Sequence, residues 1–178
     1  MLQTCGEHGY RNLTVQRVLD RYGGNRAQFY GEFPNLEACY LEAYETEGGR
    51  VCAAVLQAGA AAPTWREGLR AALDALASYA CEQPLPARAL LVDVHCAGEA
   101  ALCKRKEMLE RLCRALDSAR RENRFRHSPP PLTALFMVSA IETALVTALA
   151  AGEPQRFQRV VPELVALVCT AYFGEEPA

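Results

Sequence analysis

The chain has 178 residues, and 51% of them are hydrophobic, which is enough to bury a substantial core in one domain or in a small domain joined to a larger one. Runs rich in alanine and leucine, without strand-like alternation, predict an all-α protein. The formal net charge of -2 is ordinary for a soluble protein and does not point to a polyanion as a partner of the whole chain.

Eight cysteines raise the question of disulfides or zinc. They are scattered along the chain without a CxxC pair, and the N-terminus lacks the charged and then apolar pattern of a secretory signal. We therefore expect most of them to be small buried hydrophobic residues in a protein of the reducing cytoplasm.

The stretch from Leu13 to Phe33 predicts two short helices joined by a glycine pair. Thr14 has a hydroxyl that can cap the first helix, whose apolar residues then share one face: Val15, Val18, Leu19 and Tyr22. Gly23 and Gly24 end this helix, because glycine adopts the left-handed conformation without steric cost. Asn25 can cap the next helix at once. The pattern is that of a helix-turn-helix.

The second helix, from Arg26 to about Phe33, is predicted to present polar side chains to DNA. Its aromatic residues Phe29 and Phe33 are expected in the core, so that Arg26, Gln28 and Tyr30 point outward. A guanidinium binds guanine or phosphate, a carboxamide pairs with adenine, and a tyrosine hydroxyl donates to a phosphate oxygen. Double-stranded DNA is therefore the predicted partner of this helix.

From Gly9 to Tyr44 the sequence has, in order, G-Y-x-x-x-T-V, a two-glycine turn, F-Y-x-x-F and a capped long helix. This order resembles the tetracycline repressor (TetR) family of transcriptional regulators. The resemblance implies an all-helical dimer with a helix-turn-helix at its N-terminus. It also implies a divergent C-terminal domain that binds a small molecule and thereby releases the operator.

The resemblance further implies roles for single residues of the head. Thr14 would contact a phosphate and Tyr30 the DNA backbone, while the segment that reads the groove would comprise Asn25, Arg26, Ala27 and Gln28. We expect a DNA-binding domain at 1-45 and a ligand-binding and dimerisation domain at 46-178. The first helix has room for only about two turns before Gly9, so a shortened first helix is expected.

The charge of the head bears on its affinity for DNA. Residues 1-50 contain five arginines and seven acidic residues, a difference of -2. Because phosphate neutralisation supplies most non-specific affinity, such a head should bind weakly and with a shallow salt dependence unless its arginines gather on the groove face. Four of the five arginines are placed to do so.

Helical periodicity, capping residues and breaks predict the rest of the body as antiparallel helices. Pro84 and Pro86 are expected to break the series of helices, and Pro162 is expected to begin the last helix. Gly48 and Gly49 could bend the helix expected at residues 35-59. With three helices in the head this gives about nine in all, the later ones at residues 35-59, from 64 to the break at 84-86, 87-96, 99-126, 132-151 and 162-173.

A largely apolar ligand pocket is expected inside the fourth to eighth helices. Its candidate residues are polar or adaptable groups on apolar stripes, and core packing is the alternative for each: Tyr79, His95, Met108, Phe136 and Glu142. Glu142 needs a partner, which is an arginine, a ligand cation or a group of a second subunit. His95, Cys96 and Cys103 lack the register of a metal site, so neither metal nor cofactor is expected.

Residues 132-151 and 162-173 are predicted to form a homodimer interface. Both segments are strongly apolar, and Ala140, Ala144 and Ala148 would let another helix approach closely. Residues 132-151 are long enough to raise the question of a membrane span. Glu142 at their centre favours a buried helix instead, and no membrane partner is expected.

These patterns predict a cytoplasmic DNA-binding transcriptional regulator, a repressor whose operator binding is released by a small-molecule effector. The alternative is a helical dimer that senses a ligand or binds a protein partner with weak or no DNA binding. An enzyme is not predicted, because the sequence has no paired base and nucleophile.

Overall fold

The computed structural model describes residues 1-118 and 129-174. These residues form helices and no strand, so the predicted all-α fold is confirmed. The elements in chain order are α1 (Leu2–His8), η1 (Tyr10–Asn12), α2 (Val15–Tyr22), α3 (Arg26–Glu32), α4 (Leu36–Ala60), α5 (Trp65–Glu82), α6 (Pro84–Leu91), η2 (Asp93–Cys96), α7 (Glu99–Leu116), α8 (Thr133–Ala150) and α9 (Gln155–Phe173), where η1 and η2 are short 3-10 helices.

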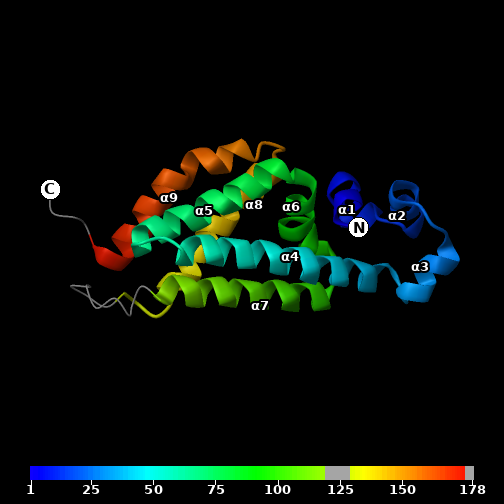
Figure 1. The fold of residues 1–178 in the computed structure, drawn as a ribbon, viewed down its shortest axis with the longest axis horizontal. Helices are drawn as coiled ribbons and strands as arrows, with labels where there is room; N and C mark the ends of the chain where they lie inside the picture. Colours follow the sequence, from blue (N-terminus) through cyan, green and yellow to red (C-terminus); the bar gives the residue numbers. More distant parts are fainter. Residues whose placement is uncertain (119–128, 175–178) are drawn as a thin grey trace.

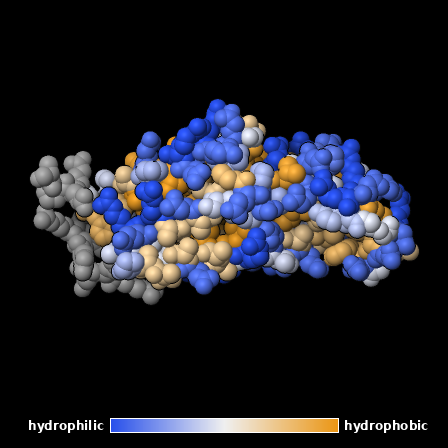
Figure 2. All heavy atoms as spheres, turned by 45° about the horizontal axis from the view of Figure 1, so that its top comes forward, coloured by the Kyte–Doolittle hydropathy of each residue, from blue (hydrophilic) through white to orange (hydrophobic). Residues whose placement is uncertain are grey.

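The molecule is elongated, with α2 and α3 at one end (Figure 1). We call residues 1-35 the head and the helices from α4 onward the body. α4 leaves the head and runs along the body, where it packs against α5 and α7 (Figure 1). The face seen in Figure 2 is largely hydrophilic at the head end and exposes apolar residues between polar ones along the body. One helix thus connects the two ends of the molecule.

Two clusters of buried side chains hold these helices together. The first joins Leu2, Leu13 and Val18 of the head to Tyr40 of α4 and to Leu90 of α6. The second lies deeper in the body and contains buried residues of α5, α8 and α9, with partly buried residues of α7 against it. Because the first cluster includes residues of both parts, the head packs directly on the body. The domain boundary at residue 45 remains a prediction, and α4 runs through it without a break.

Three expected helix ends differ in the structure. α6 begins at Pro84 rather than at residue 87. Proline is tolerated there because the N–H groups of the first helical turn have no acceptor within the helix, so the missing N–H of proline costs no hydrogen bond. α9 begins at Gln155 and contains Pro162 in its interior, so this proline does not begin the helix. α7 ends at Leu116, and the remainder of the expected helix, residues 119-126, lies outside the described residues.

Candidate DNA interface and ligand cavity

The helix-turn-helix is built from caps and a glycine turn. Thr14 caps α2, since its Oγ1 accepts a hydrogen bond from the N–H of Arg17 at 3.2 Å. Gly23 and Gly24 have φ of 79° and 95°, a region that side-chain-bearing residues rarely adopt. α3 follows immediately, and its Phe29 is buried while Phe33 is half-buried. The local sequence signals therefore define this motif correctly.

All six residues proposed to contact DNA lie on the surface of the head. They are Thr14, Asn25, Arg26, Ala27, Gln28 and Tyr30, each of them exposed. Tyr30 keeps 53% of its surface accessible, and its ring meets Phe29 edge to face. Tyr22, expected on the apolar face of α2, is instead exposed at the end of that helix. It adds a second tyrosine to the same part of the surface.

Asn25 and Gln28 hold each other in place at the start of α3. The Asn25 carboxamide accepts the N–H of Gln28, and the Gln28 carboxamide accepts the N–H of Asn25, both at 3.0 Å. This reciprocal capping box fixes the first turn of the helix. It also occupies the acceptor oxygen of Gln28, which leaves the amide NH₂ of that side chain for a base or phosphate.

Of the seven acidic residues in residues 1-50, four lie on α4, whereas Glu7, Asp20 and Glu32 belong to the head together with four arginines. Glu45 pairs with Lys104 of α7 at 2.9 Å, and Glu47 pairs with Arg50 at 2.7 Å. Arg21 pairs with Glu7 of α1. Among the described residues no ion pair engages the exposed guanidinium groups of Arg11, Arg17 and Arg26. The net charge of -2 for residues 1-50 therefore understates how positive the tip is.

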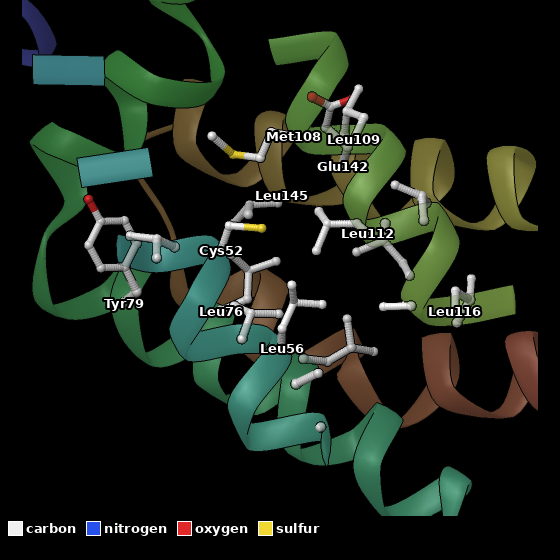
Figure 3. A pocket seen from close by; sticks show the side chains of 18 of the residues that line it. Cys52, Leu56, Leu76, Tyr79, Met108, Leu109, Leu112, Leu116, Glu142 and Leu145 are labelled. Atoms are coloured by element: carbon white, nitrogen blue, oxygen red, sulfur yellow. The ribbon is translucent and has the colours of Figure 1, made fainter. Parts of the chain in front are cut away.

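A cavity of about 310 Å³ lies among α4, α5, α6, α7 and α8 (Figure 3). Its wall is largely apolar, and Arg105 and Glu142 are the charged residues that line it. The structure brings three of the five candidate ligand residues to this wall: Tyr79, Met108 and Glu142.

The other two candidates, His95 and Phe136, do not line the cavity. His95 is exposed in η2, after the end of α6. Phe136 lies on the outer face of α8, where 66% of its surface is accessible. Sequence reasoning missed Tyr44 and Arg105, which do line the cavity. The sequence offered only their positions in α4 and α7, and those positions do not distinguish a cavity residue from an ordinary core or surface residue.

Glu142 has the arginine partner that was one of its three expected alternatives. Arg105 of α7 donates to it through Nε at 2.9 Å and also through a terminal nitrogen, so the pair is bidentate. Tyr79 donates from its hydroxyl to Glu47 at 2.9 Å, and burial together with this bond raises the pKa of Tyr79. Two polar clusters thus lie at the margin of an apolar space.

All eight cysteines are free thiols. Four of them are buried, as expected: Cys5, Cys39, Cys52 and Cys169. Cys81 and Cys113 are half-buried and Cys96 and Cys103 are exposed, so half of the cysteines are buried rather than most of them. Within residues 1-118 and 129-174, no group of three or more histidine, cysteine or acidic side chains is arranged to hold a metal ion.

α8 and α9 each expose large apolar side chains. Leu135 and Phe136 of α8 are 52% and 66% accessible, and Leu167 of α9 is 63% accessible. Of the helices that the structure describes, α8 is long and apolar enough to span a membrane by length and composition, and 39% of its 18-residue window is buried. The expected buried helix is therefore buried on one side, and its other side is accessible in the single chain.

Comparison with known proteins identifies the fold. No family model and no curated protein sequence matches the chain. Among solved structures, the crystal structure of a TetR family transcription regulator from Marinobacter aquaeolei VT8 superposes with a TM-score of 0.72. It is 20% identical, and the match covers 96% of this chain and 90% of that one.

The chain therefore has the fold of a helical transcription regulator with an N-terminal helix-turn-helix. That fold is the one of the TetR family, so the resemblance read from the motifs between Gly9 and Tyr44 is confirmed at the level of the fold. At 20% identity the likeness concerns the fold alone, and the residues of this chain must supply the argument for function.

Proposed function

We propose that this protein is a DNA-binding transcriptional regulator, a repressor that releases its operator when a small molecule occupies the cavity. The observation that carries the proposal is the helix-turn-helix, whose second helix exposes Arg26 and Tyr30 at one end of the fold. A guanidinium and a phenol hydroxyl bind base edges and phosphate oxygens. The solved structure that shares the fold is a TetR family transcription regulator.

The proposal includes a homodimer through residues 132-151 and 162-173. The exposed apolar face of α8 and α9 supports it, because a surface of this kind is covered in a stable soluble protein. A twofold axis at this face would pair two heads, and paired heads read two half-sites about one DNA turn apart or slightly more. The operator should therefore be palindromic.

The proposed location is the cytoplasm, which the eight free thiols support. We assign no enzymatic activity to the chain. The effector is expected to be largely apolar, since the cavity wall is built mostly from leucine, valine, alanine and glycine.

The test is binding of the purified protein to DNA from upstream of its own coding region, at low and at moderate salt. Arg26→Ala should weaken specific binding by at least about tenfold, the usual effect of losing a base-reading or phosphate-binding arginine. Arg70→Ala is the matched control, because Arg70 is an exposed arginine of α5 that pairs with Asp74 in the body. Equal losses in both variants, or none in either, would contradict the assignment of α3.

The alternative is a helical dimer that senses a ligand or binds a protein partner without gripping DNA. Its motivation is the limited set of contact groups, since Arg21 pairs with Glu7 and the Asn25 and Gln28 carboxamides cap α3. If the wild-type protein, and an N-terminally extended form of it, retain no DNA even at low salt, this alternative replaces the regulator.

A further inference from the structure

The wall of the cavity is long, because it follows the axes of α4 and α5. On α4 the lining residues extend from Tyr44 to Ala60, and on α5 they extend from Trp65 to Tyr79. At the rise of an α-helix these stretches are about 24 Å and about 21 Å long. The lining therefore extends for about 20 Å along two neighbouring helices. Such a space suits a linear molecule better than a compact one.

The polar groups of the wall gather at the end that lies nearer the head. α4 starts at the head, and Tyr44 is the first of its residues that line the cavity. Arg105 is likewise the first lining residue of α7, and the residues that follow it in the wall are mostly apolar. In Figure 3, Met108 and Glu142 lie toward the top of the cavity, and Leu56 and Leu116 lie toward the bottom. The other end is mostly apolar, and the residues that line it are Leu56, Gly59, Ala60, Trp65, Ala115, Leu116 and Ser118.

Tyr44 has an unsatisfied hydroxyl in this wall. The residue is only 2% exposed, and among the described residues its hydroxyl has no hydrogen-bond partner. The comparable tyrosines are all bonded: Tyr40 donates to the Ala89 carbonyl, Tyr79 to Glu47, and Tyr172 to Asp117. Among the described residues, the fully buried side-chain oxygens without a partner are Thr4 Oγ1 and Asp93 Oδ2, so the Tyr44 oxygen is instead accessible from the cavity, where a ligand atom can reach it.

The state of the Tyr44 hydroxyl fixes what it can bind. Burial raises the pKa of Tyr44 to about 12, so the hydroxyl keeps its proton at physiological pH and can donate it. The charges of Arg105 and Glu142 both act on this hydroxyl, and all three side chains line the same cavity. An oxygen acceptor on a ligand therefore meets a neutral donor in a cavity whose charged groups form a pair.

The ion pair also limits the charge of the ligand. Arg105 and Glu142 neutralise each other through two hydrogen bonds, so the polar end of the cavity carries no net charge. A ligand carboxylate or ammonium would either remain uncompensated in an apolar space or displace one partner and leave it unpaired. An uncharged headgroup avoids both costs.

We propose that the effector is a linear, uncharged amphiphile, with an alkyl chain that extends toward Trp65 and an oxygen headgroup that accepts a hydrogen bond from Tyr44. The word effector rests on the proposed function, whereas the ligand class is a property of the cavity. The bound headgroup would lie near the head, since the ring of Tyr44 is 6.0 Å from that of Tyr40, which is 4.9 Å from that of Tyr10 in η1.

The test uses the single tryptophan of the chain, Trp65, which lines the apolar end of the cavity. The probes share a ten-carbon skeleton: decan-1-ol, decanoate, decylamine and the compact adamantan-1-ol. We expect decan-1-ol to change the Trp65 emission in a saturable manner and to bind at least about tenfold more tightly than the other three. Equal or tighter binding of either charged chain would overturn the uncharged headgroup, and equal binding of adamantan-1-ol would overturn the linear shape.

Two matched variants test the role of Tyr44. Tyr44→Phe should weaken decan-1-ol binding by about five- to tenfold, the value of one buried hydrogen bond, and should melt no lower than wild type because its hydroxyl has no partner in the protein. Tyr22→Phe should change binding less than about twofold, since Tyr22 is exposed on the head and does not line the cavity. Unchanged binding in Tyr44→Phe would overturn the assignment.

Independent results decide the proposed ligand class and the proposed function. If the protein retains its upstream DNA but decan-1-ol leaves the Trp65 emission unchanged, the ligand class is wrong and the regulator stands. If decan-1-ol binds as expected but no DNA is retained at low salt, the ligand class stands and the DNA-independent sensor replaces the regulator.

Discussion

Tyr40 of α4 donates a hydrogen bond of 2.8 Å from its hydroxyl to the backbone carbonyl of Ala89 in α6. Both residues are fully buried. Ala89 lies in the last turn of α6, where carbonyl groups have no partner inside the helix and need one from elsewhere. The ring of Tyr40 also meets Tyr10 of the head edge to face. A single side chain of α4 thus fixes the position of α6 relative to the head.

The Tyr40 bond should be a measurable part of the stability. Tyr40→Phe keeps the ring but leaves the Ala89 carbonyl buried without its partner, which lowers the free energy of unfolding by about 1–3 kcal/mol. Urea denaturation followed by circular dichroism measures the difference. Tyr22→Phe serves as the control, because Tyr22 is exposed and its variant should differ by less than about 0.5 kcal/mol. Equal stability of Tyr40→Phe and wild type would contradict this role.

Asp93 of η2 makes the same junction sensitive to pH. It is 8% exposed, its Oδ2 has no hydrogen-bond partner, and the nearest cation is Arg88, whose Nε is 3.9 Å away. Burial raises the pKa of Asp93 from its ordinary value of 3.8, although Arg88 and the backbone N–H of Tyr10 act in the opposite direction. The folded protein therefore binds the proton more tightly than the unfolded chain does.

The sign of the effect follows from this raised pKa. The contribution of Asp93 to stability is fully present below pH 3.8 and is lost as the pH rises through its folded pKa. Asp93→Asn removes this titration, so its free energy of unfolding relative to wild type should increase between about pH 4 and about pH 7.5. Urea denaturation of both proteins across that range measures the trend. A constant difference would show that the burial of Asp93 has no energetic effect on folding.

Two glycines of the body should respond differently to alanine. Gly49 of α4 has no atom within 4 Å of an added Cβ, so Gly49→Ala should stabilise by about 0.5–1 kcal/mol through helix propensity alone. In Gly68→Ala the new Cβ of α5 would overlap the backbone carbonyl of Gly59 in α4, which should cost about 1–3 kcal/mol. Thermal denaturation ranks the variants, and a Gly68→Ala protein as stable as Gly49→Ala would contradict this close contact of α4 with α5.

The head could be predicted from sequence because its signals are local. Thr14, the glycine pair and Asn25 each act within three residues of their own position, and the structure uses all of them as expected. The other glycine-dependent expectation was a bend in α4 at Gly48 and Gly49. α4 is one uninterrupted helix, in which Gly48 lets Met108 of α7 pack closely and Gly49 has no atom within 4 Å of an added Cβ.

The cavity could be predicted only in outline. Its helices were expected, but the partner of Glu142 is an arginine 37 residues earlier in the chain, and spacing within a helix cannot reveal such a pair. Tyr40 and Tyr44 are one turn apart and look alike in the sequence. Only the tertiary structure shows that the first hydroxyl is bonded and the second is not. His95 and Phe136 were placed in the pocket by residue type, whereas the direction in which each faces depends on how η2 and α8 pack.

The proposed homodimer interface on α8 and α9 can be tested by placing charges in it. Phe136 of α8 and Leu167 of α9 are the most exposed large apolar residues of the described chain, at 66% and 63%. In a twofold interface each residue recurs on the partner side, so Phe136→Glu and Leu167→Glu would each bury two charges without counter-charges. Both variants should therefore be monomers at micromolar concentration in light scattering after size exclusion, with helical content unchanged by circular dichroism.

Leu102→Glu is the control for this change, because Leu102 is an exposed leucine of α7 outside the proposed interface, and its variant should remain a dimer. The DNA assay then links the two surfaces. A monomer has one head, which contacts about half as many phosphates and base edges as two paired heads do. The Phe136→Glu protein should therefore lose most of its specific operator affinity, and the Leu102→Glu protein should keep it. A wild-type monomer would overturn the proposed homodimer, and a Phe136→Glu dimer would place the subunit interface elsewhere.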